Sequence, residues 1–79
     1  MSFDYQSLLG KIVEKYGTQY NFSVAIGLSE RSLSLKLNNK VSWKDSEIYK
    51  ASKLLGIEDV DIPNYFFKRK VHEREHLTI

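Results

Sequence analysis

The segment TQYNFSVAIGLSERSLSLKLNNK, residues 18–40, decides the fold because it has the pattern of two short helices joined by a tight turn. Gly27 lies between the two helices, and glycine readily adopts the positive φ that such a turn requires. Ser29 carries a hydroxyl that can cap the first turn of the second helix. We therefore predict helices over residues 19–26 and about 29–37.

The side chains of this segment also meet the packing demands of two crossing helices. A small residue is needed where the first helix crosses the second, and Ser23 occupies that position. The apolar residues expected to face a shared core are Phe22, Ile26, Leu28 and Leu33. Two helices joined by a short turn that contains glycine define the helix-turn-helix unit, so we predict one here.

The rest of the chain is also predicted to be helical. Residues 4–16 carry an apolar stripe with the spacing of an amphipathic helix. Ser42 and Asp45 have the spacing of a capping box, and the helix that follows should stop at Gly56. Pro63 can open a last short turn whose aromatic residues close the core. The inward residues predicted for the first and fourth helices are Leu8, Leu9, Ile12, Val13, Tyr16, Trp43, Glu47, Ile48, Ala51, Leu54 and Leu55.

These elements predict an all-α fold, a compact helix-turn-helix domain of four to five helices. We assign residues 1–67 to this domain and residues 68–79 to a basic C-terminal tail. A chain of 79 residues has room for one hydrophobic core. It contains no cysteine, which suits a reducing compartment. We see neither a signal peptide nor the roughly 18 apolar residues that would span a membrane, and so expect a cytoplasmic protein without a membrane partner.

The stretch GLSERSLSLKLNNK, residues 27–40, resembles the turn, recognition helix and following loop of the lambda-repressor/Cro class of regulators. Residues 5–67 fit the five-helix layout of that class, and the chain resembles in particular small Cro-like regulators from phages of Gram-positive bacteria. The resemblance implies a sequence-specific transcriptional regulator that binds a double-stranded DNA operator in the bacterial cytoplasm. The recognition helix, about residues 29–37, would enter the major groove.

The same resemblance implies which side chains would contact DNA. Arg31 would hold a guanine through two hydrogen bonds, Glu30 would accept from a cytosine, and Leu35 would touch a thymine methyl group. Other residues would contact phosphates or lie at the edge of the groove. The full expected set is Gln19, Ser29, Glu30, Arg31, Ser32, Ser34, Leu35, Asn38, Asn39 and Lys40.

Several residues depart from the pattern of that class and leave an alternative open. Lys36 stands where an apolar residue commonly packs under the recognition helix, so we expect that helix to be seated differently. Tyr20 and Val24 lie on the outer face of the first motif helix, where polar residues are expected. Exposed apolar groups mark protein partners. Together with the aromatic segment 64–67, they favour the alternative function: an antirepressor that binds a phage repressor instead of DNA.

Charge is unevenly divided along the chain, whose formal net charge is +2. Residues 18–53 contain six lysines and arginines against three acidic residues, whereas residues 54–67 contain three acidic residues and no basic one. The positive middle favours a polyanionic partner, although a normally solvated surface has the same pattern. Since one recognition helix reads only a few base pairs, we also expect a weak homodimer formed by residues after Pro63.

The tail contains His72-Glu73-Arg74-Glu75-His76, the H-E-x-x-H pattern that on a helix presents two zinc ligands and a general base. A zinc protease also needs a third ligand and a walled substrate cleft, and only three residues follow His76. We therefore expect no metal site, no cofactor, no catalytic residue and no enzymatic activity.

Zinc at one equivalent should leave the melting temperature of chelator-treated protein unchanged, because two imidazoles in a tail leave the metal under-coordinated. Scanning calorimetry with and without zinc measures this temperature. A stoichiometric zinc titration with nanomolar affinity would contradict the expectation.

Overall fold

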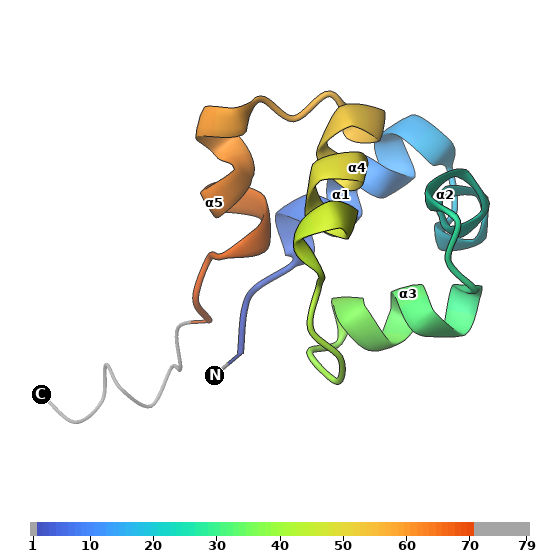
Figure 1. Ribbon diagram of the computed structural model, residues 1–79, viewed down its shortest axis with the longest axis horizontal. Helices are drawn as coiled ribbons and strands as arrows, with labels where there is room; N and C mark the ends of the chain where they lie inside the picture. Colours follow the sequence, from blue (N-terminus) through green and yellow to red (C-terminus); the bar gives the residue numbers. More distant parts are fainter. Residues whose placement is uncertain (1, 71–79) are drawn as a thin grey trace, which may run out of the picture.

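The computed structural model describes residues 2–70, which form five α-helices and one short 3-10 helix (Figure 1). Within these residues, β structure is limited to one antiparallel bridge, between Phe3 and Arg69. The all-α prediction is confirmed. The elements are α1 (Gln6–Tyr16), α2 (Gln19–Ile26), α3 (Glu30–Leu37), α4 (Asp45–Leu55), η1 (Asp59–Asp61) and α5 (Ile62–Phe66).

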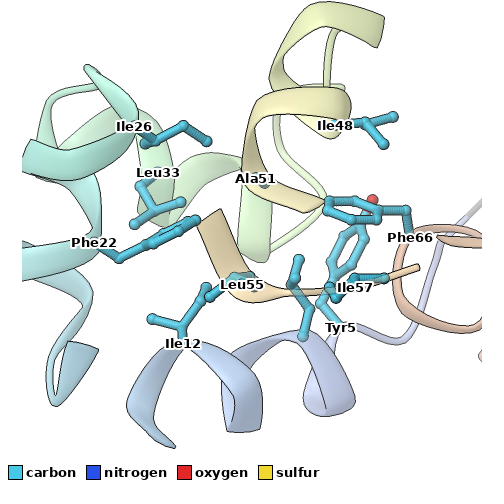
Figure 2. Close-up of a cluster of buried hydrophobic side chains, with 11 residues drawn as sticks. Tyr5, Ile12, Phe22, Ile26, Leu33, Ile48, Ala51, Leu55, Ile57 and Phe66 are labelled. Atoms are coloured by element: carbon cyan, nitrogen blue, oxygen red, sulfur yellow. The ribbon is translucent and has the colours of Figure 1, made fainter. Parts of the chain in front are cut away.

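The helices surround one apolar core, part of which is shown in Figure 2. α1 and α4 are in contact at the centre of the molecule, with α2 and α3 on one side of them and α5 on the other (Figure 1). The predicted inward residues Phe22, Ile26 and Leu33 are buried, and Leu28 packs against the core from a half-buried position. Val13 of α1 was also predicted to face inward, but its side chain is 50% exposed, so that prediction is wrong. The buried apolar residues are Tyr5, Leu8, Ile12, Phe22, Ile26, Leu33, Ile48, Ala51, Leu55, Ile57 and Phe66.

The turn between α2 and α3 has the chemistry predicted for it. Gly27 has a φ of +81°, in the left-handed region that favours glycine. The Ser29 hydroxyl accepts a hydrogen bond from the Ser32 N–H at 3.0 Å and so caps α3. Ser23 is 2% exposed, and its hydroxyl donates to the Tyr20 carbonyl, which lets this small polar residue lie inside the crossing. The predicted turn between two short helices is therefore present, with its predicted glycine and serine cap.

The start of α4 differs from the prediction. The helix begins at Asp45, and the Glu47 carboxylate accepts a hydrogen bond from the Lys44 N–H at 2.9 Å. The predicted capping box of Ser42 and Asp45 is wrong, because it places the cap two residues too early. Trp43 consequently lies in the loop before α4 and reaches the core from there.

A buried ion pair joins α3 to α4. Lys36 is 4% exposed, and its Nζ lies 3.0 Å from Glu47 Oε1. The same ammonium group donates to the Ser42 carbonyl at 3.0 Å. The ion pair and this hydrogen bond allow a lysine to lie beneath α3. From the sequence, we expected a lysine at this position to change how that helix packs.

The environment of Glu47 lowers the pKa of its carboxyl group. Burial acts to raise this pKa, but the hydrogen bond from Lys44 and the hydrogen bond and charge of Lys36 outweigh burial. The carboxylate therefore adds stability at pH values above the ordinary pKa of a glutamate. That contribution is lost as the pH falls through the lowered value in the folded protein.

Lys36→Met should reduce the free energy of unfolding by about 3 kcal/mol, because the Glu47 carboxylate would remain mostly buried without its counter-ion. Urea denaturation at neutral pH, followed by circular dichroism, measures the change.

Two controls isolate the ion pair. Lys50→Met, at an exposed lysine of α4, should stay within about 0.5 kcal/mol of the unaltered protein. Adding Glu47→Leu to Lys36→Met should restore most of the loss, since an apolar pair of similar volume often replaces a buried ion pair without penalty. Equal effects at Lys36 and Lys50 would show that the pair contributes nothing.

Candidate functional site

The residues expected to contact DNA are spread between the start of α2 and the loop after α3. Glu30 and Arg31 are exposed at the start of α3, and Leu35 is half-buried on the same helix. Gln19 and Asn38 line one common cavity of about 400 Å³. The structure therefore brings the two ends of the expected set together, on a surface that the starts of α1 and α2 share with the end of α3.

Many polar groups on this surface already have partners within the protein. The Ser29 hydroxyl donates to the Ser32 hydroxyl at 2.9 Å. The Asn38 side-chain amide donates to the Ser34 carbonyl at 2.8 Å. These hydrogen bonds lie at the two ends of α3; the structural role of Ser29 was predicted, whereas that of Asn38 was not.

Asn39 clamps the N-terminal segment to the loop after α3. Its Oδ1 accepts from the Phe3 N–H at 2.9 Å, and its Nδ2 donates to the Phe3 carbonyl at 2.9 Å. Its φ of +63° is positive, a conformation that asparagine tolerates better than most residues. The other edge of the N-terminal segment pairs with the segment after α5, since the Asp4 N–H donates to the Lys68 carbonyl at 2.6 Å.

Charge on the exposed part of α3 is balanced. Glu30 and Arg31 are its exposed charged residues, whereas Lys36 is turned inward and paired with Glu47. Lys40 is exposed in the loop that follows. Lys36, which we counted among the six basic residues of segment 18–53, is therefore not exposed on the surface.

Apart from one exposed residue each on α1, α4 and η1, exposed apolar side chains lie on two other parts of the surface. Tyr20 and Val24 on α2 are 57% and 63% exposed, which confirms the predicted apolar outer face. Val41 and Phe67 are 45% and 48% exposed, and they lie where the loop after α3 meets the end of α5. Sequence reasoning named the aromatic segment 64–67 as a feature favouring a protein partner, but it missed the contribution of Val41, because the two come from distant segments of the chain.

A cluster of aromatic rings underlies the second surface. Phe3 packs edge-on against Phe67 with ring centres 5.8 Å apart, and Trp43 packs edge-on against Phe66 at 5.2 Å. Tyr5 contacts both Phe3 and Trp43. These five residues line a pocket of about 210 Å³, which we call the aromatic pocket. The prediction that aromatics after Pro63 close the core holds for Phe66, which is buried, whereas Phe67 is half exposed.

Comparison with known proteins places the chain in a family. A family model described as protein of unknown function (DUF739) matches residues 1–69, and the chain belongs to this family. No curated protein sequence matches it. Among solved structures, it is similar to the solution structure of the modulator of repression (MOR) of the temperate bacteriophage TP901-1 from Lactococcus lactis. The two share 67% sequence identity with a TM-score of 0.76, over 91% of this chain and 97% of that chain.

These findings correct two expectations. Assignment to the lambda-repressor/Cro class is wrong, because the chain belongs to a different family and is closely similar to a modulator of repression. The expected main function, a regulator that reads operator DNA with its recognition helix, is contradicted by the same findings. They favour the alternative, an antirepressor that binds a phage repressor. The packing of α2 on α3 determines the shape of the motif but not what its outer face binds. Resemblance of the motif therefore led to the wrong main function.

Some expectations concern residues beyond those described or properties that remain predictions. His72 and His76 lie outside the described residues, as does most of the predicted tail. Within residues 2–70, no group of three metal-ligating side chains is present. No helix in that range has both the length and the apolar character needed to cross a membrane. The role of each surface residue named from sequence stays a prediction.

Asn39→Gly should lower the free energy of unfolding by about 1–2 kcal/mol, because it removes both hydrogen bonds to Phe3 while glycine keeps the positive φ. Asn39→Ala should lose about 1 kcal/mol more, since alanine is strained in that conformation. Urea denaturation of the two variants gives both numbers.

Asn38→Ala is the matched control for this clamp. Asn38 is exposed and bonds only within its own helix end, so its loss should stay near 0.5 kcal/mol. If Asn39→Gly were as stable as the unaltered protein, the clamp would have no energetic role.

Proposed function

We propose that this protein modulates repression in a temperate phage by binding the phage repressor protein. The observation that carries the proposal is its 67% identity, over 91% of the chain, to a protein described as a modulator of repression. Identity at this level supports a shared kind of partner as well as a shared fold.

The surface of the protein supports a protein partner. Apolar side chains are exposed on α2 and around the aromatic pocket, and such patches are typical of protein interfaces. Lys36, in contrast, is buried in an ion pair, and the exposed part of α3 has as many acidic as basic side chains. Phosphate binding depends on exposed lysine and arginine, which this helix offers sparingly.

The proposed action is binding without catalysis. It requires no metal, cofactor or substrate, and it takes place in the cytoplasm of the bacterial host, where a phage repressor meets its operator. Bound modulator changes the occupancy of the operator by changing the amount of repressor free to bind it. The weak homodimer stays a prediction and is not required for this mechanism.

The purified protein should bind the repressor of phage TP901-1 with a dissociation constant of about 1 μM or lower, a value typical of specific complexes. Isothermal titration calorimetry measures the affinity. An electrophoretic mobility assay then follows the repressor on its operator duplex with increasing protein. We expect the intensity or the position of the repressor–operator band to change as protein is added. The protein alone should leave the mobility of the operator duplex unchanged.

The same assays can also contradict the proposed function. Absence of heat on mixing with the repressor would overturn the proposed function. A shift of the operator by the protein alone, lost on a scrambled duplex of equal length, would also overturn it, because the protein would then read DNA itself.

A further inference from the structure

We draw no further inference here: the strongest candidate, the exposed apolar outer face of α2 that Tyr20 and Val24 form, carries none, because nothing in the structure shows what covers it.

Discussion

The ion pair between Lys36 and Glu47 is the interaction on which the arrangement of the other parts depends. It links the last turn of α3 to the first turn of α4, and the same ammonium group holds the Ser42 carbonyl in the loop between them. A lysine can be buried here because its charge is paired with Glu47 and two of its three N–H donors have acceptors. Removing one partner would leave a charge in a site of low polarity, which is far less favourable than leaving the pair intact. The loop between the two helices is therefore held at both ends.

That loop in turn organises one end of the molecule. Asn39 holds the backbone of Phe3 through two hydrogen bonds, and Trp43 packs against Tyr5 and Phe66. The N-terminal segment and the segment after α5 pair with each other, which brings Phe3 onto Phe67. Aromatic rings from both ends of the chain thus gather around one loop. The aromatic pocket is a consequence of this convergence, and its shape is coupled to the position of α3.

The helix-turn-helix motif is defined by how its two helices pack, whether or not it binds DNA. The crossing of α2 and α3 needs a small buried residue, a flexible turn and an apolar inner face, and this chain supplies them with Ser23, Gly27 and Leu33. None of these requirements concerns the outer face. Here the outer face carries balanced charge on α3 and apolar side chains on α2, a surface suited to protein rather than to phosphate. Similarity to a modulator of repression agrees with the protein-binding role that we propose.

The sequence by itself determined the helices and the core, because these follow from local chemistry: apolar residues at helical spacing, hydroxyl caps at Ser29, and glycine where φ is positive. It also identified the exposed apolar face of Tyr20 and Val24. It misplaced the start of α4, since Ser42 and Asp45 have the residue types of a capping box, whereas the cap that forms is the Glu47 carboxylate on the Lys44 N–H. Only the tertiary structure decided the burial of Lys36, the clamp of Asn39 on Phe3, and the aromatic pocket. Each joins residues from distant segments, and no periodicity or local spacing encodes which distant groups will meet.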